Sequence, residues 1–297
     1  MNSGFLQNLF VGLAMLMAMA WPPAAAEDYK LEPVRGNVYR FSAGHYHSVS
    51  MVTDEGIVVA DPINAEAAAW LRKELARRFN RPIRFVIYSH NHPDHIYGGE
   101  SLDDGKAQFV AHRLARKDLI RTKARTRIPD IVFKDEMSLH LGDSRVRLRY
   151  HGPNNGLGSI SMLFEPAGVL HVVDWITLGR LPWKDLQGYD INGMINSTHD
   201  VLDMDFAVFV GGHGDVGSKQ DVRRYLGYLE ALYGEVRDGM LAGMDLRTLQ
   251  RSIHLEKYRD LKMHREWLPL NIEGVYRTLA DQSYLLMRPD VKQPSSK

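Results

Sequence analysis

A six-residue stretch rich in metal-binding side chains constrains this sequence more than any other feature. His90, His92, Asp94 and His95 follow directly after the apolar run of residues 85–88. Such a run predicts a buried strand, and the polar residues after it predict a tight turn at its end. On this turn His90 and His92 can point to one cation while Asp94 and His95 turn toward a second. Imidazole and carboxylate are ligands that zinc accepts, and the chain has no cysteine that could compete.

Later segments offer further ligands, again at the ends of predicted strands. Asp174 follows the apolar residues 169–173, and His213 stands between two glycines shortly after residues 206–210. Successive strand ends can converge on one edge of a sheet sandwich. We therefore expect these distant side chains to assemble a single site.

The order of these segments resembles the metallo-β-lactamase superfamily, whose signature His-x-His-x-Asp-His follows a strand. The resemblance covers most of residues 37–215. It implies an α/β protein with the αββα metallo-β-lactamase sandwich, and one or two zinc ions with iron as the alternative. Asp174 would bridge the two metals. The full ligand set implied by the resemblance is His90, His92, Asp94, His95, Asp174 and His213.

One position departs from that pattern. Where most members carry the third histidine of the first metal site, this chain has Asn155. A neutral amide oxygen is a weaker ligand for a zinc-like ion than an imidazole nitrogen. The first site then binds weakly through its remaining ligands, or only the second site is occupied, or another histidine fills the gap. The candidates for that histidine are His151, His45 and His47.

The resemblance also implies roles for residues around the metals. Asp94 would orient a metal-bound hydroxide and take up its proton. Asp61 stands where relatives carry an acid that accepts a hydrogen bond from a ligating histidine, and the alternative is a helix-capping role beside Asn64. Tyr97 and Trp183 follow ligand-bearing segments and are candidate substrate contacts, with core packing as the alternative.

These features predict a metal-dependent hydrolase that uses a metal-bound hydroxide on an ester, lactone, thioester or amide bond, a β-lactam included. The alternatives are an iron-dependent oxidoreductase of the same fold, or an accessory protein that binds a metal or small molecule through a degenerate site. The formal net charge is +1 and no basic stripe is present, which excludes an electrostatic nucleic-acid surface. The expected partner is a small-molecule substrate, and the oligomeric state stays open.

The N-terminal segment predicts export. Residues 1–26 carry no charged side chain, and their apolar stretch, residues 9–21, is too short to span a bilayer comfortably. Ala24, Ala25 and Ala26 supply the small residues of a cleavage site, so we expect a signal peptide over residues 1–26. An uncleaved membrane anchor is the alternative. The mature protein would then be periplasmic or secreted, without stable insertion in a membrane.

Two further regions follow from the helical patterns. The catalytic domain is expected over residues 27–217, where Asn64 predicts the start of a helix that continues through Phe79. Ser218 and Asp221 form a capping-box pattern ahead of an apolar stripe. We therefore expect a helical extension over residues 218–297.

Overall fold

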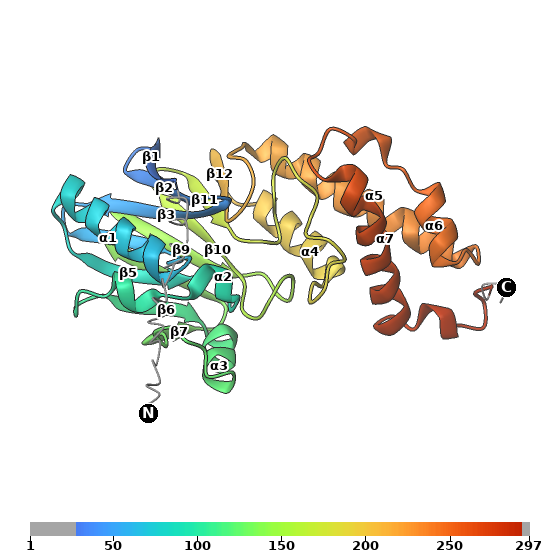
Figure 1. The fold of residues 1–297 in the computed structure, drawn as a ribbon, viewed down its shortest axis with the longest axis horizontal. Coiled ribbons are helices and arrows are strands. Elements are labelled where there is room, and N and C mark those ends of the chain that lie inside the picture. Colours follow the sequence, from blue (N-terminus) through green and yellow to red (C-terminus); the bar gives the residue numbers. More distant parts are fainter. Residues whose placement is uncertain (1–27, 293–297) are drawn as a thin grey trace, which may run out of the picture.

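Two β-sheets stack face to face in the computed structural model, which describes residues 28–292 (Figure 1). Helices cover the outer face of each sheet, so the layers run α, β, β, α. This arrangement confirms the predicted α/β class and the αββα sandwich. The predicted signal peptide, residues 1–26, lies outside the described residues.

The first sheet contains seven strands in sequence order, β1 to β7. Strands β1 to β4 pair antiparallel, whereas β4 to β7 pair parallel. Parallel strands end at a common edge, which is where a site can be built from their following loops. The strands are β1 (Tyr29–Arg35), β2 (Val38–Ala43), β3 (Tyr46–Thr53), β4 (Gly56–Ala60), β5 (Ile83–Tyr88), β6 (Gln108–His112) and β7 (Ile131–Phe133).

The second sheet has five strands in the order β12-β11-β10-β9-β8. Strands β11 and β12 run parallel, although they are far apart in the sequence, and the other pairs are antiparallel. The residues that follow β11 and β12 therefore emerge at the same edge. The strands are β8 (Glu136–Leu141), β9 (Ser144–Tyr150), β10 (Ile160–Glu165), β11 (Val169–Val172) and β12 (Val208–Gly211).

The helices begin largely where the capping residues predict. The Asn64 side chain accepts a hydrogen bond of 2.8 Å from the Ala67 backbone N–H, and Ser218 and Asp221 form the predicted capping box. The helices are α1 (Ala65–Phe79), α2 (Pro93–Ile96), α3 (Arg113–Arg121), α4 (Ile191–Leu202), α5 (Lys219–Leu241), α6 (Leu246–Ser252) and α7 (His264–Asp281), with 3₁₀ turns η1 (Gly99–Leu102), η2 (Glu256–Tyr258) and η3 (Leu285–Met287).

Three hydrophobic clusters hold the layers together. Met51 and Phe164 belong to the cluster between the sheets, and Leu71 of α1 packs on the outer face of the first sheet. The third cluster joins the second sheet to α4, α5 and α7. Each fully buried side chain of this size contributes about 1.5–3 kcal/mol. The ligand-bearing loops are therefore attached to rigid layers.

A buried asparagine ties the C-terminal helices to the loop that follows β11. Asn271 of α7 is fully buried and accepts a 2.7 Å hydrogen bond from the Tyr228 hydroxyl of α5. Its amide group donates to the backbone oxygens of Pro182, at 3.2 Å, and Lys184. The helical extension thus fixes a loop that begins at the candidate site.

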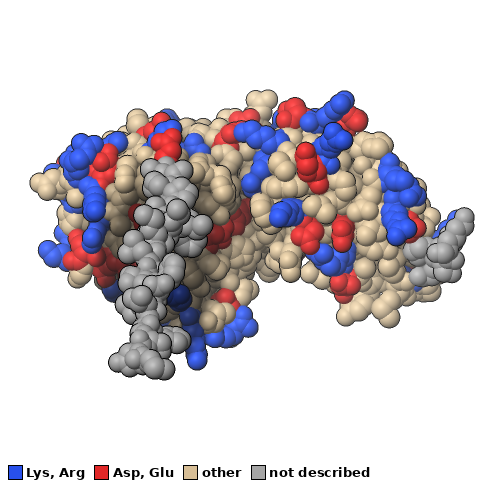
Figure 2. All heavy atoms as spheres, in the orientation of Figure 1, with Lys and Arg blue, Asp and Glu red and all other residues tan. Residues whose placement is uncertain are grey.

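Charges of both signs are interspersed over the visible face of the molecule (Figure 2). Within the described residues, no helix is both long and apolar enough to cross a membrane.

Candidate metal centre

The histidine-rich turn and the later candidate ligands meet at one edge of the sandwich. His90 follows β5, Asp174 follows β11 and His213 follows β12. Hydrogen bonds connect the two sheets here: Ile160 N–H donates to Ser89 O at 3.0 Å, and His47 N–H donates to Gly212 O at 2.8 Å. These hydrogen bonds fix the loops of the two sheets relative to one another at this edge.

The first ligand group consists of His90, His92 and Asp174. His90 Nε2 and His92 Nδ1 each lie 3.1 Å from the same oxygen, Asp174 Oδ2. His90 is fully buried and His92 is partly exposed, so solvent reaches the first ligand group from the side of His92.

The second ligand group consists of Asp94, His95 and His213. His95 Nε2 lies 3.1 Å from His213 Nε2 and 3.7 Å from Asp94 Oδ2. The other oxygen of Asp174, Oδ1, lies 3.2 Å from His95 Nε2 and 3.4 Å from His213 Nε2. Asp174 therefore faces both groups, one oxygen toward each.

The spacing of these donor atoms fits bound cations. Two donors bound to one tetrahedral zinc ion at normal bond lengths lie about 3.3 Å apart. The contacts of Asp174 with four histidine nitrogens, at 3.1 to 3.4 Å, agree with that value. The residues thus fit one cation in each group with Asp174 between them.

A family model described as "Metallo-beta-lactamase superfamily" matches residues 44–213, more than half of the 297 residues. The chain belongs to the metallo-beta-lactamase superfamily. The match includes both ligand groups, so the resemblance predicted from the histidine motif is confirmed.

Two known proteins are similar to this chain. It is 24% identical over 230 residues to "2,4-dinitroanisole O-demethylase subunit alpha" of Nocardioides sp. (strain JS1661), over 76% of this chain and 69% of that protein. The structure is similar to a metallo-beta-lactamase from Pontibacter korlensis with a TM-score of 0.61 and 16% identity. That similarity covers 68% of this chain and 99% of the other, and it shows the shared fold.

Hydrogen bonds from neighbouring groups orient the rings of His90 and His213. The Ser89 hydroxyl lies 2.7 Å from His90 Nδ1, and Ser89 N–H donates to Asp61 Oδ1 at 2.8 Å. His213 Nδ1 donates to His45 O at 3.0 Å. In both rings the bonded Nδ1 leaves Nε2 directed at Asp174.

The expected hydrogen bond from a ligating histidine to Asp61 is not formed. Asp61 accepts from the Ser89 backbone instead, because β4 and β5 are adjacent parallel strands and their ends lie side by side. Asp61 Oδ2 and His95 Nδ1 are both buried without a hydrogen-bond partner. The Asp61 charge nevertheless helps to raise the pKa of His95.

Burial and three neighbouring carboxylates give the histidines different charges. Burial lowers the pKa of both His90 and His213 to about 4. Burial also disfavours the charged form of His95, but Asp174, Asp61 and Asp94 together raise its pKa to about 9. Burial would raise the pKa of Asp174, but the neighbouring histidines, His95 foremost, hold it well below its usual value. Asp174 is therefore ionised and His90 and His213 are neutral, as metal ligands must be, whereas His95 carries a proton that a bound cation would displace.

Asn155 lies beside the first group with its amide unsatisfied. Its side-chain oxygen and nitrogen are both buried without a hydrogen-bond partner. The next residue, Gly156, touches the ligands: a Cβ there would come within 2.9 Å of His92 Nε2 and 3.0 Å of His90 Cδ2. The backbone next to Asn155 thus contacts His90 and His92, and the buried amide of Asn155 has no partner of its own.

The three histidines considered as replacements for the third ligand have other surroundings. His151 contacts Ser161 Oγ at 2.8 Å, and His47 contacts Ser42 Oγ at 3.1 Å. The His45 ring lies 5.8 Å from the His213 ring, beside the second group instead of the first. None of the three belongs to either ligand group among the described residues.

Of the two candidate substrate contacts, one packs on the core and the other lies at the surface. Tyr97 packs against the hydrophobic cluster under α1. Trp183 is 46% exposed and meets the Trp267 ring edge-on at 5.1 Å. Trp175, by contrast, is fully buried in the core.

The sequence interpretation overlooked several residues that shape the site. Ser89 directly precedes His90, so the sequence alone could have indicated a hydroxyl group beside the first ligand. Arg180 and Tyr189 lie in the loop after Asp174, and the charge of Asp174 raises the pKa of both. No motif distinguished these two residues before the fold was known.

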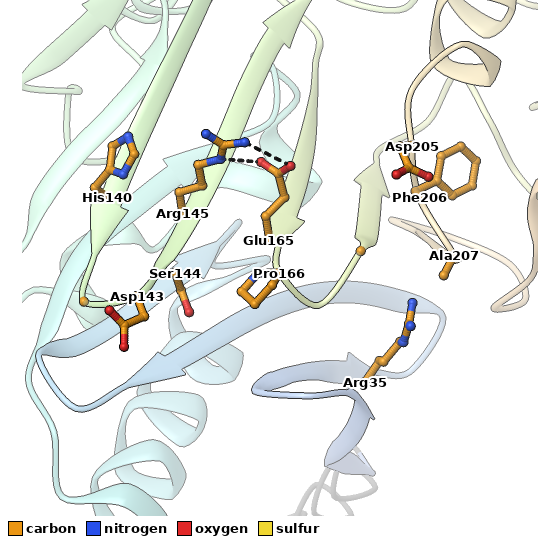
Figure 3. A pocket seen from close by; sticks show the side chains of 12 residues that line it. Arg35, His140, Asp143, Ser144, Arg145, Glu165, Pro166, Asp205, Phe206 and Ala207 are labelled. Carbon is orange, nitrogen blue, oxygen red and sulfur yellow. Dashed lines mark hydrogen bonds and ion pairs between the residues drawn. The ribbon is translucent and has the colours of Figure 1, made fainter.

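A separate hollow of about 690 Å³ lies at the opposite end of the second sheet (Figure 3). It is lined by Glu165, the last residue of β10, whereas Ile160 at the other end of β10 contacts Ser89. At the rise of a strand this separates the hollow from the metal centre by about 17 Å. Arg145 Nε donates to Glu165 at 2.7 Å, so these opposite charges neutralise each other.

Proposed function

We propose that this protein is an exported hydrolase that depends on one or two zinc ions. The observation that carries the proposal is the position of Asp174, whose two oxygens face two separate groups of metal-binding side chains. Membership of the metallo-beta-lactamase superfamily supports the same function class. The apolar stretch at residues 9–21 and the small residues Ala24, Ala25 and Ala26 support export.

The surroundings of each residue indicate its role in metal binding or proton transfer. His90, His92 and Asp174, with the Asn155 amide, would hold a first cation, and Asp94, His95 and His213 a second. A cation bound there would supply Lewis acidity, which polarises a carbonyl oxygen and lowers the pKa of water. Asp94 is 46% exposed and is the acid positioned to accept a proton at the mouth of the site.

The bond that is cleaved belongs to an ester, lactone, thioester or amide, a β-lactam included. In each of them a water molecule adds to an electrophilic carbonyl carbon, and negative charge develops on its oxygen. The superfamily fold supports many reactions, so the choice among these bonds rests on assay.

A second candidate is cleavage of an activated aryl methyl ether. It is favoured by the 24% identity with the protein named 2,4-dinitroanisole O-demethylase subunit alpha. Addition of water and loss of methanol would convert such an ether to the phenol without an external oxidant. The same ligand groups could serve this reaction.

The proposal is tested with the mature chain loaded with zinc. The panel contains 4-nitrophenyl acetate, γ-butyrolactone, an acetyl thioester, nitrocefin and 2,4-dinitroanisole. We expect turnover of at least one compound, lost on chelation and restored by zinc. Activity that survives complete metal removal would overturn the proposal, as would a metal-loaded protein that is inert toward the whole panel. Iron in place of zinc in the purified protein would favour an oxidoreductase.

A further inference from the structure

The loop that follows Asp174 carries an arginine whose charge has no counterion. Arg180 is partly buried, and its Nε atom is buried without a hydrogen-bond partner. Within residues 28–292 its guanidinium forms no ion pair and no hydrogen bond. Its contact is with the ring of Trp267 on α7, whose centroid lies 5.1 Å from the guanidinium carbon. Partial burial of a cation without a counterion costs free energy, and an anionic ligand would offset that cost.

The backbone around Arg180 is fixed from two sides. Asp215 N–H, two residues after His213, donates to Leu178 O at 3.1 Å. On the other side Lys262 N–H donates to Gly179 O at 3.0 Å. Arg180 is therefore held between the loop that carries His213 and the segment that precedes α7.

The segment that carries Arg180 lies beside the second ligand group. Leu178, two residues before Arg180, forms a backbone bridge with Gly214, the residue after His213. Burial lowers the pKa of Arg180, and the negative charge of Asp174 opposes this shift. The guanidinium is therefore within electrostatic reach of Asp174.

Tyr189 lies on the same segment of the chain as Arg180. Tyr189 forms a backbone bridge with Asn155, and burial raises its pKa well above the usual value, with Asp174 adding to the shift. The hydroxyl therefore stays protonated and can donate a hydrogen bond. Arg180 and Tyr189 thus both lie on the segment that follows Asp174, with Tyr189 next to Asn155.

Neighbouring basic residues differ from Arg180. Arg277 pairs with Asp185 at 3.4 Å and Lys262 pairs with Asp215 at 3.3 Å, while Lys184 is exposed to water with its ammonium 4.5 Å from the Trp183 ring. The lack of a counterion is thus not general in this region. Packing on Trp267 alone would not require a charged side chain.

We propose that Arg180 binds a carboxylate of the substrate beside the metal centre, so that the natural substrate is an anionic compound. This inference rests on the proposed function. The planar guanidinium offers paired donors that match a carboxylate, and the shielded position strengthens the interaction. Arg180 would act as a specificity-determining residue, and the cations would act on the bond that is cleaved.

The test uses binding, so it does not require turnover. Thiols bind zinc through sulfur, and their carboxylates are then presented beside the metal centre. The probes are mercaptoacetate, 3-mercaptopropionate and 4-mercaptobutyrate, which vary the reach, and 3-mercapto-1-propanol as the uncharged counterpart. Affinities for the zinc-loaded protein are measured by calorimetry, with metal content determined on the same samples.

We expect the best carboxylate to bind the unmodified protein about tenfold more tightly than the alcohol, and Arg180→Met to remove most of that preference. Arg180→Lys should retain part of it, and the matched control Lys184→Met should retain all of it. Unchanged affinity for the alcohol shows that each variant keeps the metal site. The inference is overturned if no carboxylate is preferred, if no thiol binds, or if Arg180→Met keeps the preference. A preserved preference without any hydrolysis overturns only the proposed function.

Discussion

His95 Nε2 lies 3.1 Å from His213 Nε2, although the two residues are 118 positions apart in the sequence. His213 Nδ1 donates to His45 O, so the lone pair of His213 Nε2 points at His95. Two imidazole nitrogens at this distance need a proton or a metal ion between them. Asp174, which contacts both rings, provides the negative charge that holds such a cation.

Removal of metal should therefore destabilise the protein. At a zinc concentration about 100 times the dissociation constant, bound metal adds about 2.7 kcal/mol to the free energy of unfolding. Calorimetry of chelated and zinc-loaded samples should show a melting temperature lower by several degrees after chelation, and restored by zinc. Equal melting temperatures would show that no cation supports these ligands.

Asp94→Ala should reduce kcat at least about 100-fold on any substrate that the protein turns over, because the acid at the mouth of the site is lost. The matched control is Asp143→Ala, which removes an exposed acid in the distant hollow. Steady-state kinetics on both variants decide the point. Comparable activity in the two variants would exclude a catalytic role for Asp94.

Asn155→His should tighten metal binding in the first group, because an imidazole nitrogen is a stronger ligand for zinc than an amide oxygen. The buried amide has no hydrogen bond to lose. Competition with a chromophoric chelator should show at least about a tenfold gain in affinity for one equivalent of zinc, and little change for the other. If both affinities stay as they were, Asn155 does not face the first cation.

Asn271→Leu should destabilise the protein by about 2–4 kcal/mol, since it leaves the Tyr228 hydroxyl and the Pro182 carbonyl unpaired in the core. Urea unfolding measures the change. The control Asn196→Leu alters an exposed residue of α4 and should change stability by less than about 0.5 kcal/mol. A variant at Asn271 as stable as this control would show that the hydrogen bonds are not needed.

Much of the site could be predicted because its ligands follow apolar runs. His90 after β5 and Asp174 after β11 needed only the assumption that strand ends meet at one edge, and the structure brings them to 3.1 Å. The capping residues Asn64 and Ser218 likewise signalled where helices begin, since they act on the adjacent backbone.

The rest depended on contacts between distant segments. Strand β1 and helix α4 were not predicted, because their burial arises from neighbours that the local pattern does not contain. Asp61 bonds to the Ser89 backbone because β4 pairs with β5, and pairing partners cannot be read from one strand. Arg180 gave no signal, because the absence of a counterion is visible only after folding.

The most direct test of the account is metal content in the unmodified protein and in Asp174→Ala. Both are purified without added metal, dialysed against zinc at equal concentration, and measured by mass spectrometry. The account predicts about one to two zinc ions per chain in the unmodified protein and a large loss in the variant, because Asp174 contacts both ligand groups. A metal-free unmodified protein, or equal zinc content in the two, would contradict the claim that these side chains form a metal centre.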